Sequence, residues 1–177
     1  ELFESIDTIM HSVINNSNFL LPQIAPDGNY CPINSIEISI NYNFGWNLIG
    51  LPLDIEDSNY QILFPVSIDG TLYSFDNEYI QEIDLKNGFG YWLRFEETGS
   101  QPISGGTLNQ LNIELIQGWN LVSGSVSELS LEDITDPQGL IVGGTLYTFE
   151  YGYIQSIIIE PGIGYWLRSN GNGFITL

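Results

Sequence analysis

Apolar residues recur along this chain with two different periods. Residues 1–16 place apolar side chains three and four positions apart, the period of an amphipathic helix, at Leu2, Phe3, Ile6, Ile9, Met10, Val13 and Ile14. From Ser35 onward the period is two, as in Ile36-Glu37-Ile38-Ser39-Ile40, and such alternation is typical of a half-buried β-strand. The pattern predicts a single N-terminal helix followed by β-structure.

The β-structure is encoded twice. The offset between the copies is 74 residues from Tyr91 to Tyr165 and 73 residues from Trp46 to Trp119. The repeated motifs of the first copy are Gly45-Trp46-Asn47-Leu48, Gly70-Thr71-Leu72-Tyr73, Tyr79-Ile80-Gln81 and Gly88-Phe89-Gly90-Tyr91-Trp92-Leu93-Arg94. Self-similarity of this length indicates duplicated structural units. We expect β repeat units at 35–105 and 106–177, preceded by a segment at 1–34 that holds the helix and a Pro-rich linker.

Each copy is predicted to contain five or six short antiparallel strands. Tyr73-Ser74-Phe75 turns through Asp76-Asn77-Glu78 into Tyr79, which is a hairpin pattern, and copy two repeats it through Glu150-Tyr151-Gly152. Short helical turns are expected at 54–58 and 128–133, and closing strands at 101–103 and 173–177. A unit of about 70 residues is near the lower limit of independent stability. We therefore expect the copies to pack face to face, as a sandwich or barrel, with the helix covering one end.

Two details concern the strands themselves. Gly90 and Gly164 lie inside a predicted strand, where glycine marks a bulge or a close approach, and Trp46 and Trp119 are the side chains expected to lie over them. Copy two has Ser123-Gly124-Ser125 where copy one has Gly50-Leu51-Pro52. This difference predicts that the second strand of copy two ends differently from that of copy one.

Charge narrows the possible partners. The chain has 22 acidic residues against three basic ones, a net charge of −19. Such a charge repels phosphates and anionic membrane surfaces, so nucleic acid is not an expected partner. No apolar run approaches the roughly 20 residues that span a bilayer, so we expect no membrane insertion. The chain begins with Glu1 rather than Met, and we expect a mature or excised piece of a larger protein.

The sequence offers no catalytic constellation and no cofactor site. It has one histidine, His11, and one cysteine, Cys31, and it lacks a nucleophile-elbow motif and a phosphate-binding loop. We interpret both residues as ordinary structural positions and expect no enzyme. The composition is also compatible with a glycosidase that uses two carboxylates, but no feature of the sequence selects two of the 22 acidic residues for that role.

Two acidic loops carry oxygen ligands that calcium accepts, at Asp54, Glu56 and Asp57 and at Glu128, Glu132, Asp133 and Asp136. Neither matches an EF-hand loop. We interpret them as solvated loops and predict no metal site, although calcium stays possible without a motif to support it.

The candidate ligand-binding residues are Trp92, Arg94, Trp166, Arg168, Tyr79 and Tyr153. Arg94 and Arg168 are the only arginines, and they occupy equivalent positions on the predicted Trp92 and Trp166 faces. One interpretation is structural: each guanidinium stacks on a ring and pairs with Asp76 or Glu150, while the aromatic residues fill a core. The other is functional: arginine and exposed rings form a ligand platform that binds sugars. Exposure of the tryptophans or of the two tyrosines in a planar row would favour the second.

The stretch from Gly45 to Leu53, the hairpin and Asn87 to Arg94 together resemble a loosely defined β-repeat of bacterial and archaeal secreted and cell-surface proteins. That repeat reads "GWNLISLP", then "PGxGYW" and a basic residue. The resemblance implies an extracellular or cell-surface module without catalytic residues. We expect a non-catalytic module for adhesion, structural spacing or protein–protein contact, with another protein or a surface polysaccharide as partner, and a carbohydrate-binding module as the alternative.

Overall fold

The computed structural model describes residues 23–24, 30–31 and 35–177, and it divides the chain into two compact units, 1–35 and 36–177. In the first unit, β1 (Gln23–Ile24) pairs with β2 (Tyr30–Cys31) in an antiparallel ladder, so the predicted linker contains a short strand pair. The predicted helix at 1–16 and His11 lie outside the described residues. Both repeat copies belong to the second unit.

The copies have matching sheets. In copy one, β4 (Gly45–Gly50), β7 (Gly90–Phe95), β5 (Tyr73–Asp76) and β6 (Glu78–Gln81) form a four-stranded sheet in that order. In copy two the same order is made by β10 (Gly118–Ser123), β15 (Gly164–Ser169), β12 (Tyr147–Phe149) and β13 (Tyr153–Gln155). All these pairings are antiparallel. The prediction of a mainly β protein with two repeat units is confirmed, and the sheets are open rather than closed into a barrel.

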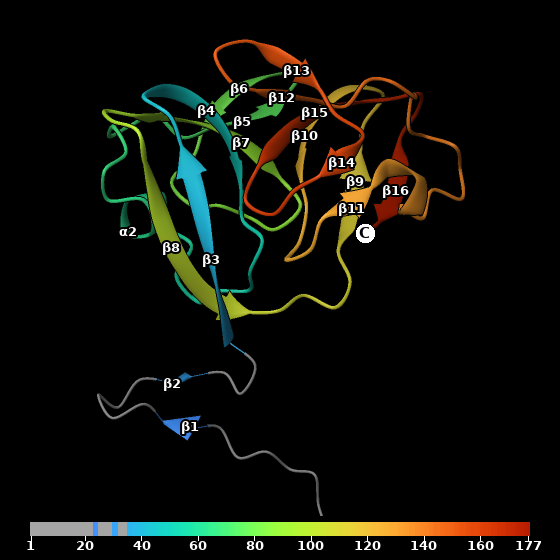
Figure 1. The fold of residues 1–177 in the computed structure, drawn as a ribbon. Coiled ribbons are helices and arrows are strands. Elements are labelled where there is room, and N and C mark those ends of the chain that lie inside the picture. Colours follow the sequence, from blue (N-terminus) through green and yellow to red (C-terminus); the bar gives the residue numbers. More distant parts are fainter. Residues whose placement is uncertain (1–22, 25–29, 32–34) are drawn as a thin grey trace, which may run out of the picture. The chain divides into compact units, whose positions relative to one another are not determined.

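Smaller ladders flank the two sheets. Copy one has β3 (Ser35–Tyr42) paired with β8 (Gly99–Gly106), and copy two has β9 (Asn112–Leu115) paired with β16 (Gly173–Thr176). Figure 1 shows these pairs on opposite sides of the unit. Copy two adds a short ladder between β11 (Leu129–Ser130) and β14 (Ile158–Ile159). The closing strands expected at 101–103 and 173–177 are present.

The helical turns agree only partly with expectation. A 3₁₀ turn, η1 (Leu131–Asp133), lies inside the predicted range of copy two. In copy one the turn is α2 (Tyr60–Leu63), which follows rather than fills residues 54–58. The reason is local: the side chain of Asn59 accepts from the Gln61 amide and caps the turn, whereas Asp54 is extended and exchanges two backbone hydrogen bonds with Gly106.

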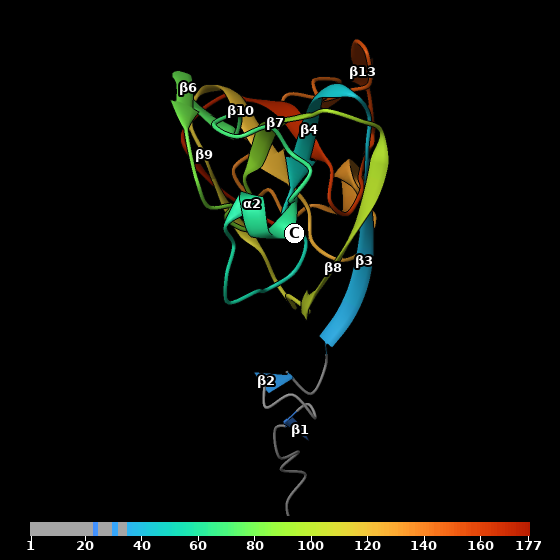
Figure 2. The same cartoon turned by 90° about the vertical axis from the view of Figure 1, so that its left-hand side faces the viewer.

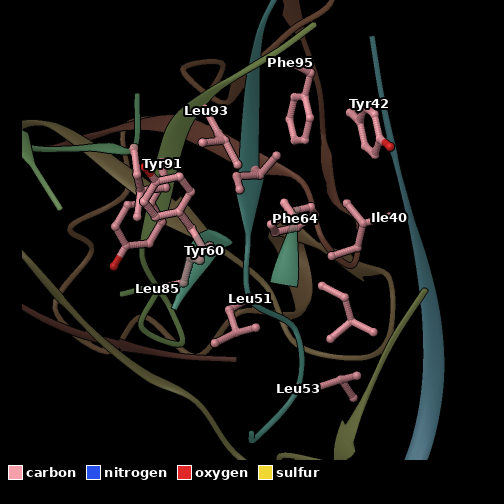
Figure 3. Packing of buried hydrophobic residues seen from close by; sticks show 13 residues of the cluster. Ile40, Tyr42, Leu51, Leu53, Tyr60, Phe64, Leu85, Tyr91, Leu93 and Phe95 are labelled. Atoms are coloured by element: carbon pink, nitrogen blue, oxygen red, sulfur yellow. The ribbon is translucent and has the colours of Figure 1, made fainter. Parts of the chain in front are cut away.

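Each copy has its own apolar core, and a third core lies between the copies. In copy one, Tyr91, Leu93 and Phe95 of β7 pack in one cluster with Ile40 and Tyr42 of β3 and with Phe64, the residue that caps the C-terminal end of α2 (Figure 3). The equivalent core of copy two is built around Leu115, Tyr165 and Leu167. The third cluster joins buried Leu48, Leu121 and Trp166 with half-buried Phe75, Trp92, Tyr147 and Phe149, so it belongs to both copies.

Contacts between the copies are reciprocal. The Gly50 amide donates to the Gly162 carbonyl at 3.0 Å, and the equivalent Ser123 amide donates to the Gly88 carbonyl at 3.0 Å. The bridge between Ile49 and Ile163 has its counterpart between Val122 and Phe89. Contacts in which equivalent residues exchange roles define a two-fold relation. The two copies are therefore related by a pseudo-two-fold axis.

Two expectations differ from the structure: how the second strand of copy two ends, and what lies over Gly90 and Gly164. β4 and β10 each have six residues and end at equivalent positions, so the second strand of copy two does not end differently. Instead, Gly50 and Ser123 face each other: a Cβ on Gly50 would lie 2.1 Å from the Ser123 Cβ. The close approach at Gly90 and Gly164 is present, but not by Trp46 or Trp119. It comes from backbone of the other copy, Val122 and Ile49 respectively, which lies 2.7 Å from the position that a Cβ would occupy in each case.

Candidate functional site

The register of copy one places the repeated aromatic residues on one face of its sheet. Trp46 lies opposite Arg94, and Leu48 lies opposite Trp92. Tyr73 also pairs with Trp92, and Phe75 pairs with Tyr79. Because alternate residues of a strand share a face, all these side chains leave the sheet on the side away from the copy-one core. Copy two repeats this arrangement in β10, β15, β12 and β13.

Two grooves lie on these faces. Groove 1 has a volume of about 430 Å³ and is lined by Trp46, Tyr73, Tyr79, Trp92 and, from copy two, Phe149. Groove 2 has a volume of about 520 Å³ and is lined by Trp119, Thr145, Tyr147, Tyr153, Trp166, Arg168 and, from copy one, Phe75. Each copy thus supplies most of one groove and a single phenylalanine of the other.

The rings meet at nearly the same geometry in both grooves. Trp46 lies edge-on to Trp92 with centroids 6.3 Å apart, and Trp119 lies edge-on to Trp166 at 6.3 Å. Phe75 contacts Trp166 at 4.8 Å, and Phe149 contacts Trp92 at 4.9 Å, both edge-to-face across the axis. Edge-to-face pairs are favoured by the aromatic quadrupole and hold the rings at fixed angles. The walls of both grooves are therefore fixed by contacts that bind the copies together.

Hydrogen bonds of the repeated polar residues hold the strands that carry these rings. Asn47 is buried: its Nδ2 donates to the carbonyls of Asn43 and Gly45, and its Oδ1 accepts from the Asn43 amide. Asn120 repeats all three bonds in copy two. These bonds close the turn immediately before Trp46 and Trp119. The sequence shows that this asparagine is repeated, but its role in closing the turn is visible only in the structure.

Behind the grooves, two equivalent tyrosines anchor β7 and β15 in the cores. The Tyr91 hydroxyl accepts from the Lys86 amide at 3.0 Å, and the Tyr165 hydroxyl accepts from the Glu160 amide at 3.1 Å. Burial disfavours the phenolate and raises the pKa of each to about 12, although the backbone hydrogen bond acts in the opposite direction.

The predicted ligand residues divide into buried and exposed groups. Trp166 is only 8% exposed and Trp92 is half-buried, so both form the floor of a groove rather than a free surface. Tyr79 and Tyr153 are 55% and 60% exposed. Within each groove the two indole rings are nearly perpendicular, at 89° for Trp46 and Trp92 and at 86° for Trp119 and Trp166. The structure also adds Trp46 and Trp119, each 40% exposed, which were expected to lie over glycines.

The arginines are exposed beside the grooves. Among the described residues, neither Arg94 nor Arg168 forms an ion pair, and the expected pairing with Asp76 and Glu150 is not present. The register explains this: Tyr73 pairs with Trp92 in antiparallel strands, so Arg94 is level with Thr71, while Asp76 is at the other end of β5. Arg168 lines groove 2, and Arg94 lies next to Trp46 of groove 1. Each keeps its guanidinium donors available to a ligand.

The acidic loops do not converge. Within the part of the chain that the structure describes, no three His, Cys, Asp or Glu side chains are grouped so that they would hold a metal ion. Asp136 instead accepts from the amides of Leu140 and Ile141 and closes a turn. The described residues also contain no helix long and apolar enough to cross a membrane.

Comparison of the chain with protein-family models, with curated proteins and with solved structures gives no match. The grooves must therefore be interpreted from their own chemistry.

Proposed function

We propose that this chain is a non-catalytic adhesion module of a secreted or cell-surface protein and that its two aromatic grooves bind neutral polysaccharide. The observation that carries the proposal is the pair of open grooves at equivalent positions, each with an exposed tryptophan and an exposed tyrosine. Concave sites with aromatic walls and a few polar groups are typical of ligand-binding surfaces. The location follows from the resemblance of the repeats to secreted and cell-surface proteins.

The chemistry of the grooves favours sugar rings. Indole and phenol rings offer apolar faces to the C–H faces of a pyranose, and the phenolic hydroxyls and guanidiniums donate to its hydroxyl groups. The net charge of −19 repels anionic polysaccharides, and the apolar ring faces of the grooves suit uncharged sugar rings, so we take neutral polysaccharides as the ligand class. The side chains that line the grooves therefore include both the apolar rings and the hydrogen-bond donors that a sugar-binding module requires.

Affinity electrophoresis tests the proposal. Native gels containing hydroxyethyl cellulose, galactomannan, alginate or poly-L-proline would be compared for the wild type, the double variant Trp46→Ala/Trp119→Ala and the control Phe174→Ala. Phe174 is exposed and lines neither groove. We expect hydroxyethyl cellulose or galactomannan to retard the wild type and the control but not the double variant. Retardation by poly-L-proline alone would replace the sugar with a proline-rich peptide, and no retardation at all would reject the proposed binding.

Contact with another protein is a second candidate function. It rests on exposed isoleucines at equivalent positions along the hairpins, Ile80 and Ile83 in copy one and Ile154 and Ile157 in copy two. β6 and β13 are also edge strands, whose free backbone groups can pair with another chain. Sedimentation velocity from low to high micromolar concentration tests self-association, the simplest such contact. Association that disappears in Ile83→Asp/Ile157→Asp would support it, and a monomer throughout would remove self-association.

A further inference from the structure

The pseudo-two-fold axis determines how the two grooves are oriented relative to each other. Phe75 of copy one enters groove 2 and Phe149 of copy two enters groove 1, so the grooves exchange under the same operation that exchanges the copies. In Figure 2 the hairpin strands β6 and β13 lie on opposite sides of the upper end of the unit. A two-fold rotation reverses every direction perpendicular to its axis.

A polysaccharide chain has direction, since its reducing and non-reducing ends differ. A chain lying across the axis and continuing from groove 1 into groove 2 would meet the second groove with its direction reversed. It would then be unable to make the same contacts in both. Two separate chains related by the same two-fold operation would make the same contacts in both grooves.

The region between the grooves also opposes a single bound chain. Leu48 and Leu121, which lie between the two sets of aromatic residues, are buried, as is Trp166. The edge-to-face pairs across the axis fill this centre. The exposed rings that would stack on sugars, Trp46 with Tyr79 and Trp119 with Tyr153, therefore form two separate sets and not one continuous track.

We propose that the module cross-links two neutral polysaccharide chains, one in each groove, related to each other by the pseudo-two-fold axis. This inference rests on the proposed function and specifies its valence. The guanidinium beside each groove forms no ion pair with any residue that the structure describes, and it provides equivalent donors for the hydroxyl groups of the two chains. Linking two sites in this way lets weak individual affinities yield strong attachment to a matrix that presents many chains.

Two measurements on the full chain test the valence. Titration calorimetry with cellohexaose and mannohexaose gives the number of sites, and dynamic light scattering of dilute hydroxyethyl cellulose and galactomannan detects cross-linking. For the sugar that binds, we expect two sites in the wild type and one site in Trp46→Ala or Trp119→Ala. We expect the wild type to increase the scattering of the corresponding polymer and each single variant to lose that increase while still being retarded in affinity gels.

The variants Tyr79→Ala and Tyr153→Ala provide a second pair with the same expectation, because these exposed side chains contribute little to folding. One site in the wild type, or cross-linking that persists in every single variant, would overturn the inference and leave the proposed function standing. Absence of any binding by the wild type would overturn both. The two failures are thus distinguishable.

Discussion

At the scale of single residues, the repeated tyrosines of the two heptapeptide motifs serve the cores rather than the grooves. Tyr91 and Tyr165 are almost fully buried, each with a hydroxyl that accepts one backbone hydrogen bond. Their neighbours in the sequence, Trp92 and Trp166, point to the opposite face of the strand and form the groove floors. Because successive residues of a strand point to opposite faces, the tyrosine of each motif packs in a core while the neighbouring tryptophan lines a groove.

The first prediction concerns the ionisation of these tyrosines. Because burial raises the pKa of Tyr91 and Tyr165 to about 12, they should ionise later than exposed tyrosines, whose pKa is about 10. Their folded pKa exceeds the unfolded value, so the stability that they contribute is complete below about pH 10 and decreases as pH rises toward 12. Phenolate absorbance at 295 nm measures the titration.

Tyr91→Phe and Tyr165→Phe identify the late step, since the two changes should remove similar parts of its amplitude. Denaturation by urea at pH 9 and pH 11 checks the sign of the stability change. A single absorbance transition near pH 10 that includes all tyrosines would contradict the account.

At the scale of elements, the hairpins hold the two copies together. Phe75 on β5 contacts Trp166 of the other copy, and Phe149 on β12 contacts Trp92. Each phenylalanine also lies edge-on to the tyrosine of its own hairpin, Tyr79 or Tyr153. The hairpin signal in the sequence predicted β5–β6 and β12–β13 but not their contact with the opposite copy.

Truncating these phenylalanines should destabilise the whole unit. Removing a fully buried Phe side chain costs about 3–5 kcal/mol, and for half-buried Phe75 and Phe149 we expect about 1–3 kcal/mol each for the change to Ala. Because the two contacts are equivalent, the two losses should be similar. Urea denaturation measures them, with exposed Phe174→Ala as the control, expected within about 0.5 kcal/mol of the wild type. Losses as small as that of the control would show that the hairpins do not join the copies.

The elements also show how far the sequence could predict the fold. Alternation and the repeat identified the strands of both copies, because period-two burial is local information. The helical turn at Tyr60 was misplaced because the Asn59 cap and the pairing of Asp54 with Gly106 decide its position, and the second of these is a contact between distant residues. Gly90 and Gly164 predicted that another segment packs closely against each strand, but a glycine alone does not identify that segment.

The candidate site was predictable only in part. Alternation placed Trp92 and Arg94 on one face correctly. Whether a ring on that face is buried depends on the other copy, since Phe75 covers Trp166 and Phe149 covers Trp92. Trp46 and Trp119 were missed as ligand residues because each borders an edge of its sheet, and edges are assigned by strand order rather than by sequence.

At the scale of the whole molecule, duplication has produced one interlocked unit with a third core shared by both copies. The two copies interact through isologous contacts, the type of interface that identical subunits form in a symmetric dimer. The two copies differ in sequence where they meet at the axis, with glycine at position 50 and serine at the equivalent position 123. Gly50 and Ser123 face each other so closely that only one of the two residues has space for a side chain.

The double-mutant cycle between these two positions tests the pseudo-two-fold packing most directly. Gly50→Ser should destabilise the protein by about 1–3 kcal/mol, because its Cβ would overlap that of Ser123. Ser123→Gly should change stability by about 1 kcal/mol or less, because loss of strand rigidity is offset by removal of a buried hydroxyl that has no hydrogen-bond partner in the structure.

Urea denaturation of the wild type, the two single variants and the double variant Gly50→Ser/Ser123→Gly measures the coupling between the sites. If the axis passes between Gly50 and Ser123, exchanging the two residues should restore stability to within about 1 kcal/mol of the wild type, a strongly non-additive result. A double variant that loses at least the sum of the two single losses would mean that the two strands do not meet at this point, and the pseudo-two-fold packing would be wrong.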